Sequence, residues 1–331
     1  ISARWGRKRV VLAGTTVFLL GSIVCAAAPT VETLMAGRVL QAAGASSGVV
    51  VGRAVIRDVF AGAQLMRVMA VVAMIFALVP GFTPLIGGIL QAVFDWRAQF
   101  ITAGLMAIAL FAAIVLRLPE TNRKPLARLR LVDTLRGYAI VLRSRAFIRY
   151  ALSTALVFGG LFGFLAGSPG VFVDHLGVSP TEYGIYPPIT VAGFIIGGLV
   201  TRRLAGNVSS NAIAAAGLAL LTVGSVVLLV LPEIALFNRY SITATMVVYI
   251  TGLGVYAPMA IAEALSLFGE RAGTASSVIG FAQMSGGAAG TLIVAALHGW
   301  FPVRAFPITM AAMTVAALAA FLIIRGSGER A

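Results

Sequence analysis

An arginine and a glutamine interrupt an apolar stretch, at Arg38 and Gln41 in the segment RVLQAAGASSGVVVGRAVIRD of residues 38–58. Arg38 lies about two helical turns into the apolar run, where an unpaired guanidinium costs roughly 2.5–3.5 kcal/mol. A charge kept at that cost normally has a purpose, so Arg38 is a candidate for proton coupling or gating within a membrane. The alternative is that its long side chain reaches the near interface and only anchors the helix.

The helix that positions Arg38 carries a stripe of small residues, because Gly44, Gly48 and Gly52 recur every four residues. On a helix they form one smooth face that a neighbouring backbone can approach closely. We expect this helix to pack tightly and to slide against its neighbour. Similar stripes occur at Gly159/163/167, Gly193/197 and Gly286/290. Such stripes also pack immobile membrane bundles, and that interpretation stays open.

The composition excludes a soluble protein. Of the 331 residues, 60% are hydrophobic and 11% are charged, with a mean hydropathy of +0.99. The net charge is +14, but the basic residues fall in alternate loops and form no single face for nucleic acid. The one cysteine, Cys25, excludes an internal disulfide. The chain opens on Ile1 without a signal peptide, so we expect that its natural start is missing.

The apolar runs predict an all-α polytopic membrane protein with about ten transmembrane helices. The run at 66–94 is too long for a simple crossing, so we expect it to be tilted or kinked. The predicted spans are 10–28, 31–51, 66–94, 98–116, 147–167, 184–200, 212–231, 240–265, 274–297 and 305–324.

A polar and basic stretch divides the chain. We predict an N-terminal helical bundle at 1–116, a cytoplasmic linker at 117–145 and a C-terminal helical bundle at 146–331. If the basic opening loop is cytoplasmic, only Arg97, Arg239 and Arg304 lie on the other side, with Arg38 inside the membrane. This asymmetry predicts that both ends are cytoplasmic. Trp96, Trp300 and Tyr240 would then be interface anchors on the far side, and Trp5 on the near side.

Several motifs carry a resemblance to a known family. ISARWGRKR at 1–9 is similar to the loop between the second and third helices of the major facilitator superfamily, and Arg4, Gly6, Arg7 and Lys8 match its second half. RVLQAAG at 38–44 resembles the fourth-helix motif, and PLIGG at 84–88 resembles the end of the fifth-helix antiporter motif. Three further segments resemble the Bcr/CflA group of drug:proton antiporters: GRAVIRDVF at 52–60, GSPGVF at 167–172 and GTASSVIGFAQ at 273–283.

The resemblance implies the major facilitator fold, with ten of an expected twelve helices present and the first two missing. Two positions depart from the family pattern. Ala3 replaces the acidic residue of the loop motif, which puts normal gating in doubt. Thr83 replaces a glycine of the antiporter motif, although Pro80 and Pro84 still predict a kink and Gly87 and Gly88 keep the end of the motif.

Gating and coupling depend on few charged groups. Asp58 falls near the opening loop in the family fold, so an ion pair to Arg4 or Arg7 could close that side and break when the halves rock. A solvated helix end is the alternative. Of the acids, only Glu263 is a candidate for a position within the membrane. The resemblance implies a coupling carboxylate on the first helix, so we expect these 331 residues to bind substrate weakly and not to pump.

The substrate site of this fold lies at the midplane, between the halves. Aromatic candidates for lining it suit apolar or cationic drugs, although such residues more often serve ordinary helix packing. The candidates are Arg38, Gln41, Phe158, Phe162, Phe164 and Gln283. His175 and His298 lie apart from any carboxylate cluster, and we expect no metal and no cofactor.

The resemblance implies a secondary active transporter of the bacterial inner membrane that exports drugs or other small amphipathic molecules in exchange for protons, as in antibiotic resistance by multidrug efflux. Its partners would be the small-molecule substrate, protons and the lipid bilayer, and we expect a monomer. A facilitator or exporter of a sugar, amino acid or other metabolite without proton coupling is the alternative, and a channel-like pore is an alternative of another class. An enzyme is not expected, because the sequence has no HExxH, GxSxG or GxxxxGK[ST] motif.

Overall fold

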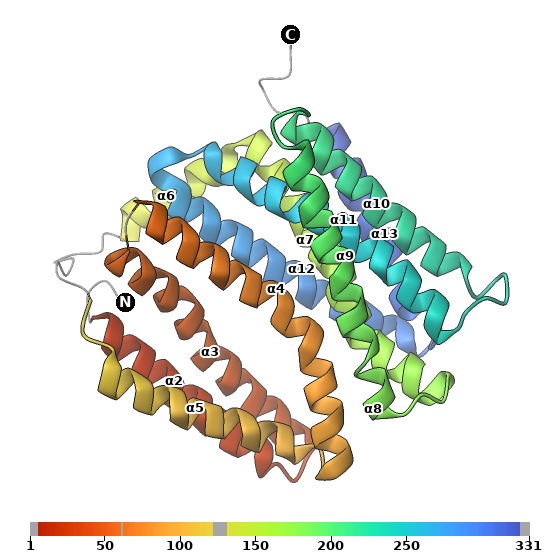
Figure 1. Ribbon diagram of the computed structural model, residues 1–331, viewed down its shortest axis with the longest axis horizontal. Helices are drawn as coiled ribbons and strands as arrows, with labels where there is room; N and C mark the ends of the chain where they lie inside the picture. Colours follow the sequence, from red (N-terminus) through yellow and green to blue (C-terminus); the bar gives the residue numbers. More distant parts are fainter. Residues whose placement is uncertain (1–5, 61, 122–130, 325–331) are drawn as a thin grey trace. The chain divides into compact units, whose positions relative to one another are not determined.

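A computed structural model describes residues 6–60, 62–121 and 131–324 (Figure 1). The chain divides into two compact units, unit 1 at Ile1–Leu129 and unit 2 at Arg130–Ala331. The division falls within the segment 117–145 that the sequence predicts as a linker.

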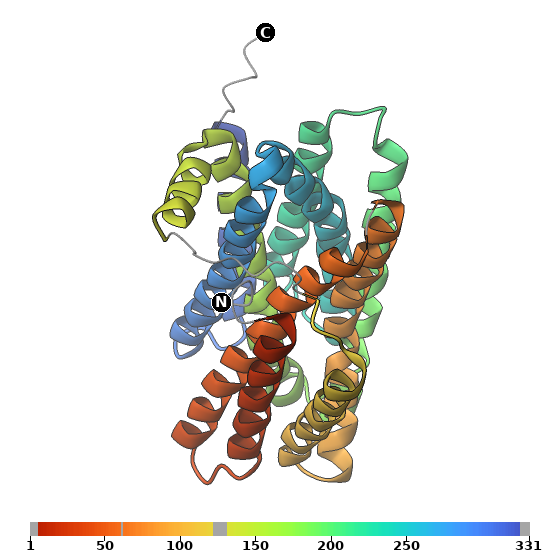
Figure 2. The same cartoon turned by 90° about the vertical axis from the view of Figure 1, so that its left-hand side faces the viewer.

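Unit 1 contains four long helices: α2 (Arg7–Ala26), α3 (Val31–Val59), α4 (Gly62–Val93) and α5 (Arg97–Arg117). The side chain of Thr30 caps α3 by accepting a hydrogen bond from the backbone N–H of Thr33, so the chain turns sharply after α2. α2 packs against both α3 and α5, and Figure 2 shows α2 and α3 side by side.

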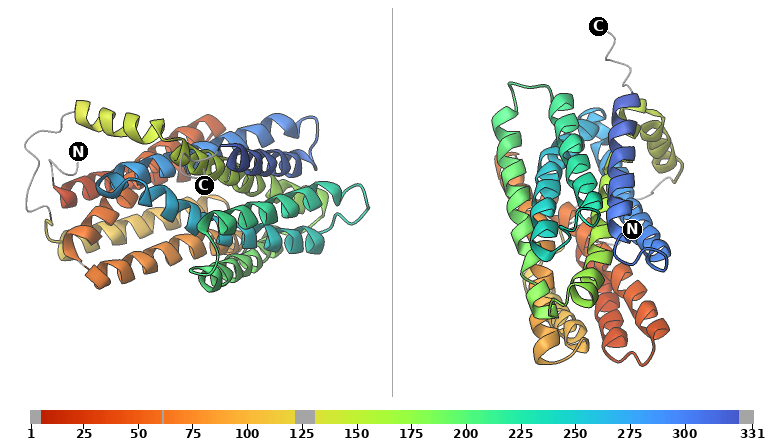
Figure 3. Two further views of the ribbon diagram at one scale, coloured as in Figure 1. Left: turned by 90° about the horizontal axis from the view of Figure 1, so that it is seen from above. Right: turned by 90° about the vertical axis from the view of Figure 1, so that its right-hand side faces the viewer.

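Unit 2 begins with a short amphipathic helix and continues with six long ones. Its core is formed mainly by α7, α10, α11 and α13, with α9 and α10 on either side of α11 (Figure 3). The elements are α6 (Leu131–Arg143), α7 (Arg145–Gly170), η1 (Val171–His175), α8 (Pro180–Tyr183), α9 (Tyr186–Leu204), α10 (Ser210–Val230), α11 (Arg239–Ser266), η2 (Gly269–Arg271), α12 (Ala272–His298) and α13 (Ala305–Ile323).

The predicted fold class is confirmed. Over the described residues, nine helices are long and apolar enough to cross a membrane, and α4 adds the shorter apolar segment Gly81–Val93. Most boundaries shift by a few residues from the prediction: α2 already begins at Arg7, for example, and the largest shift is in α3, which continues to Val59. α6 lies inside the predicted linker, where the basic composition hid a helical period.

α4 contains both prolines of the antiporter motif, and Figure 1 shows that the helix changes direction along its length, as the prolines predict. Gly88 is buried. A Cβ added at Gly87 would lie 3.7 Å from the amide of Gln99 in α5. The end of this motif therefore lies beside α5, with room for a Cβ at Gly87.

Among the described residues, glycines bring four pairs of helices into backbone contact: α2–α3, α7–α12, α10–α11 and, through the predicted stripe Gly193/197, α9–α11. In the α2–α3 seam (Gly14, Gly21, Gly37 and Gly44), a Cβ added at Gly21 would lie 2.5 Å from the backbone nitrogen of Gln41. In the α7–α12 seam (Gly159, Gly163, Gly286 and Gly290), a Cβ added at Gly286 would overlap the carbonyl oxygen of Ala155. No other residue type fits such positions without separating the helices.

The predicted stripe at Gly44, Gly48 and Gly52 is only partly used in this way. Gly44 belongs to the α2–α3 seam, where an added Cβ would lie 2.6 Å from the carbonyl oxygen of Gly14. A Cβ added at Gly48 or Gly52 would meet no described atom within 4 Å. The close contact of α3 therefore follows a seven-residue spacing from Gly37 to Gly44, with Gln41 between them.

Candidate functional site

Arg38 is held in place by a chain of hydrogen bonds across the α2–α3 seam. Its Nη1 donates to Oε1 of Gln41 at 2.9 Å, and Nε2 of Gln41 donates to Oγ of Ser22 at 2.8 Å. The Ser22 hydroxyl donates in turn to the carbonyl oxygen of Phe18 at 2.9 Å. The buried amide of Gln41 and the buried hydroxyl of Ser22 are therefore both paired, as buried polar groups require.

The seam explains how a short serine reaches the network. Gly21 and Gly37 allow the backbones of α2 and α3 to approach closely, which brings Ser22 within reach of the Gln41 amide. Arg38 itself is exposed, and its guanidinium carbon lies 6.0 Å from the ring centroid of Phe100 in α5. Unit 1 thus presents a fixed positive charge within the apolar span of α3.

Gln41, predicted as a substrate contact, is buried within unit 1, and its role toward substrate stays a prediction. Only 4% of the residue is exposed, and both its amide oxygen and its amide nitrogen are bonded within unit 1. The hydrogen bonds show that Gln41 positions Arg38. An apolar helix gives no periodic signal for which face is buried, so the sequence could not separate these two roles.

At the basic end of unit 1, the ion pair expected for Asp58 is present. Nε of Arg7 lies 3.0 Å from Oδ2 of Asp58, and the hydroxyl of Thr121 donates to the same oxygen at 3.3 Å. The pair joins the start of α2 to the end of α3 and to the segment after α5. Arg4, the other predicted partner, lies outside the described residues.

Glu120 completes this end, although the sequence analysis did not single it out. Its carboxylate accepts hydrogen bonds from the backbone N–H groups of Arg7 at 2.8 Å and Lys8 at 3.2 Å. The residue preceding α2 is Gly6, which has a φ of 93° and provides no side-chain cap. Glu120 therefore caps α2 from a distant part of the chain.

The predicted aromatic residues of α7 have different environments. Phe164 is buried and packs edge-on against Phe306 of α13, with ring centroids 5.7 Å apart. It is a core residue of unit 2, and its role as a substrate contact stays a prediction. Phe158 and Phe162 are half-buried, and the ring of Phe162 covers Gly287 of α12.

The two remaining candidates of unit 2 are half-buried. Gln283 lies on α12, and Glu263 lies near the end of α11. The structure records no hydrogen bond or ion pair of either side chain with another described residue. Their predicted roles stay predictions.

The motif GSPGVF at 167–172 coincides with a change of helix type. Pro169 lies inside α7, and the chain continues from Val171 as the π-helical turn η1. The hydroxyl groups of Ser168 and Tyr183 are hydrogen bonded at 2.8 Å. π-helical turns within helices are frequent at functional sites, which makes this segment part of the candidate site of unit 2.

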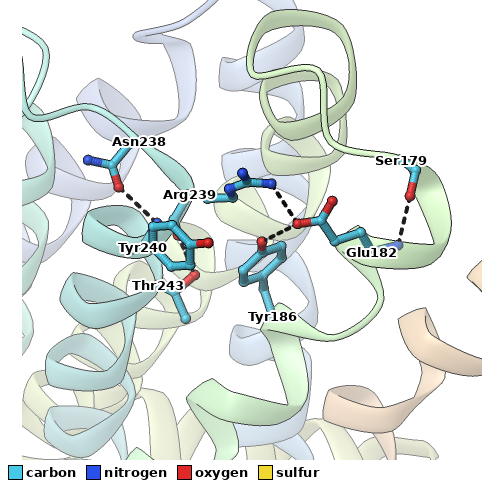
Figure 4. Close-up of polar contacts among 7 residues, drawn as sticks. All are labelled: Ser179, Glu182, Tyr186, Asn238, Arg239, Tyr240 and Thr243. Atoms are coloured by element: carbon cyan, nitrogen blue, oxygen red, sulfur yellow. Dashed lines mark hydrogen bonds and ion pairs between the residues drawn. The ribbon is translucent and has the colours of Figure 1, made fainter.

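A second polar cluster ties α8 and α9 to α11 (Figure 4). Oε1 of Glu182 accepts hydrogen bonds from Nη1 of Arg239 at 2.6 Å and from the Tyr186 hydroxyl at 2.8 Å. Asn238 caps α11 by accepting from the backbone N–H of Ser241 at 3.1 Å. The cluster fixes the segment that follows η1 to the start of α11.

Comparison with known proteins agrees with this architecture. The family model described as Major Facilitator Superfamily matches residues 1–291. The MFS-type transporter YdgK of Bacillus subtilis is 30% identical over 85% of this chain and 70% of its own length. A bicyclomycin resistance protein homolog of Haemophilus influenzae is 26% identical over 88% of this chain and 74% of its own length. The multidrug resistance protein MdtL of Escherichia coli is 28% identical over 86% of this chain and 71% of its own length.

Two solved structures share the fold. A bacterial homolog of the human lysosomal transporter Spinster, in an inward-facing and unoccupied conformation, aligns with a TM-score of 0.73 and 14% identity over 97% of this chain and 82% of that one. The human organic anion transporter MFSD10 aligns with a TM-score of 0.69 and 18% identity over 98% of this chain and 78% of that one. The fold, the motifs and the family match together show that this chain belongs to the major facilitator superfamily.

Proposed function

We propose that the protein is a secondary active transporter that exports small amphipathic molecules in exchange for protons. The names of its relatives in Haemophilus influenzae and Escherichia coli support drugs as the substrate class. The observation that carries the proposal is Arg38, a guanidinium fixed within an apolar span by a buried amide. A purely structural protein has little reason to keep such a charge there.

In this proposal Arg38 acts through its fixed charge. A guanidinium stays protonated in proteins, so Arg38 does not itself release a proton. Its charge would favour the ionised form of a nearby proton carrier, and would hold an anionic group until a proton neutralises that group. The family resemblance implies that this carrier lies on the first helix of the fold. Within the described residues, Glu263 is the acid we propose as the alternative carrier.

The contacts of Arg7 support a related proposal for gating. Both Arg7 and Asp58 belong to unit 1, so the ion pair and the Glu120 cap stabilise the basic end of that unit. We propose that α2, α3 and the segment after α5 move as one body while the two units rock alternately. We place the basic ends on the cytoplasmic side of the inner membrane, and we expect a monomer.

Reconstituted vesicles test the function. Because the 331 residues alone are expected not to pump, the intact gene product is placed in liposomes that contain a pH-sensitive dye, and a gradient of a cationic drug is then imposed. Exchange predicts that drug movement drives protons in the opposite direction, and that an imposed pH gradient drives drug movement. Drug movement without any pH change would indicate a facilitator, and single-channel currents would indicate a pore. Either result would overturn the proposal.

A further inference from the structure

α6 is a helix with two unlike faces. Gly137 and Val141, four residues apart, face the rest of unit 2: a Cβ added at Gly137 would lie 3.7 Å from the Thr274 hydroxyl of α12, and Val141 is fully buried. α6 packs against α7 as well as α12. Among the described side chains of α6, this face lies against unit 2.

The opposite face of α6 is apolar and exposed. Leu135, Ala139 and Leu142 follow the spacing i, i+4 and i+7, so they form one stripe along the helix. Leu135 is 60% exposed and Leu142 is 50% exposed. Two leucines on one stripe of a 13-residue helix leave a continuous apolar surface in need of an apolar neighbour.

Charged and aromatic residues border this stripe. Arg136 and Arg143, seven residues apart, are both exposed along one edge, and Tyr138 is half-buried at the other edge. Arginine can lay its methylene groups on apolar surface while its guanidinium reaches phosphate. Tyrosine favours the boundary between apolar and aqueous layers. An apolar stripe with such borders is typical of a helix that lies in a membrane interface.

The position of α6 agrees with that environment. With 13 residues α6 is about 20 Å long, too short to span a bilayer. Ser144 has extended backbone angles and caps α7 by accepting from the backbone N–H of Phe147. α6 and α7 are therefore separate helices, and α6 lies where the membrane span of α7 begins.

We propose that α6 lies in the headgroup layer of the membrane, with the Leu135–Ala139–Leu142 stripe against the acyl chains and with Arg136 and Arg143 bound to anionic phospholipid headgroups. Charge complementarity favours anionic headgroups as the partner, because Arg136, Arg143 and Arg145 are all cationic and exposed. Binding of α6 to the membrane would fix the start of α7 at a defined depth. The affinity of α6 for the membrane would depend on the lipid composition.

Spin labelling tests the proposal in lipid nanodiscs. Cys25 is the only native cysteine and is buried, so labels are attached in a Cys25→Ala background at Leu142→Cys or Leu135→Cys. A label at Val208→Cys, in the exposed turn between α9 and α10, is the matched control. Collision rates with oxygen and with a water-soluble nickel chelate are compared in nanodiscs with and without phosphatidylglycerol.

The proposal expects high oxygen and low nickel collision rates at positions 135 and 142, and high nickel rates at position 208. Adding phosphatidylglycerol should lower the nickel rates further, and the double substitution Arg136→Gln with Arg143→Gln should abolish that response to lipid. High nickel rates at 135 and 142 would show that the stripe faces water. Low rates with both reagents would show that protein covers it. Each of these two results overturns the proposal.

Discussion

Two of the glycine seams, α2–α3 in unit 1 and α7–α12 in unit 2, resemble each other in backbone geometry but differ in what lies between the helices. In the α7–α12 seam, Gly286 and Gly290 face the carbonyl groups of Ala155 and Gly159, and the half-buried ring of Phe162 covers the neighbouring Gly287. In the α2–α3 seam, the glycines flank a polar path from Ser22 through Gln41 to Arg38. The α7–α12 seam therefore packs two helices closely, whereas the α2–α3 seam also holds a chain of hydrogen-bonded polar side chains.

This difference shows how a charge can be placed within a membrane helix bundle. A buried glutamine between two helices is expensive unless both ends of its amide are bonded. The glycines of the α2–α3 seam satisfy that condition, because they bring Ser22 within hydrogen-bonding distance. The same motif of small residues therefore serves stability in unit 2 and presentation of a cation in unit 1.

The largest effect is expected from adding a methyl group to the α7–α12 seam. In Gly286→Ala the new Cβ would overlap three backbone atoms of Ala155, which cannot rotate away. We expect a loss of about 3 kcal/mol or more, at the upper end for overpacking. Thermal unfolding followed by size exclusion measures it. Gly280→Ala on the same helix meets no described atom within 4 Å and should unfold like the parent. Equal stability of the two variants would refute the close contact.

The same change in the α2–α3 seam should cost less. In Gly44→Ala the new Cβ would lie 2.6 Å from the carbonyl oxygen of Gly14, but the outer faces of α2 and α3 are exposed enough for the pair to separate. We expect a loss of about 1–3 kcal/mol. The control is Gly48→Ala, which has open space at its Cβ. If Gly48→Ala were the more damaging variant, the seven-residue spacing assigned to this seam would be wrong.

Removing the polar path sharpens the comparison further. Gln41→Leu leaves the guanidinium of Arg38 unsupported and removes the donor to Ser22, for an expected loss of about 1–3 kcal/mol. Transport per folded molecule should fall as well. Ser22→Ala is the matched variant, because it keeps the Arg38–Gln41 bond and should retain most transport. Full transport by Gln41→Leu would show that the hydrogen bonds from Ser22 through Gln41 to Arg38 are not needed for transport.

The smallest loss of stability is expected from removing one buried hydroxyl group in unit 2. Tyr249 of α11 is fully buried and donates to the carbonyl oxygen of Val157 in α7 at 3.0 Å. Tyr249→Phe should lower stability by about 0.6 kcal/mol, the mean for such bonds within membranes, without lowering transport per folded molecule. Tyr240→Phe, at an exposed ring, should change neither quantity. A transport defect in Tyr249→Phe would assign function to the packing of unit 2.

The sequence predicts the long helices well because spanning a bilayer requires long apolar runs. It misplaces helix ends whose residues are charged, as at Arg7 and at Asp58, where charge indicates loop although the backbone stays helical. It also misses α6, since the basic residues of 117–145 dominate its composition. The exposed and docked faces of α6 emerge only from its contacts in unit 2.

The sequence predicts some contacts of the candidate site and misses others. Arg7 and Asp58 could be paired from the motifs, but Glu120 could not, because it binds backbone N–H groups that lie 113 and 112 residues earlier in the chain. Gln41 and Phe164 were assigned to substrate because a membrane helix is apolar on all sides. Only tertiary packing shows that both point into their own unit.

Arg38→Gln in the intact gene product tests the central claim most directly. Drug transport driven by a pH gradient is measured in reconstituted vesicles, expressed per folded molecule and compared with Arg38→Lys. Arg38 is exposed, so we expect both variants to fold. The account predicts that Arg38→Gln loses gradient-driven transport, whereas Arg38→Lys, which keeps the charge, retains part of it. Transport by Arg38→Gln at the rate of the parent protein would contradict the claim that this fixed charge couples transport to protons.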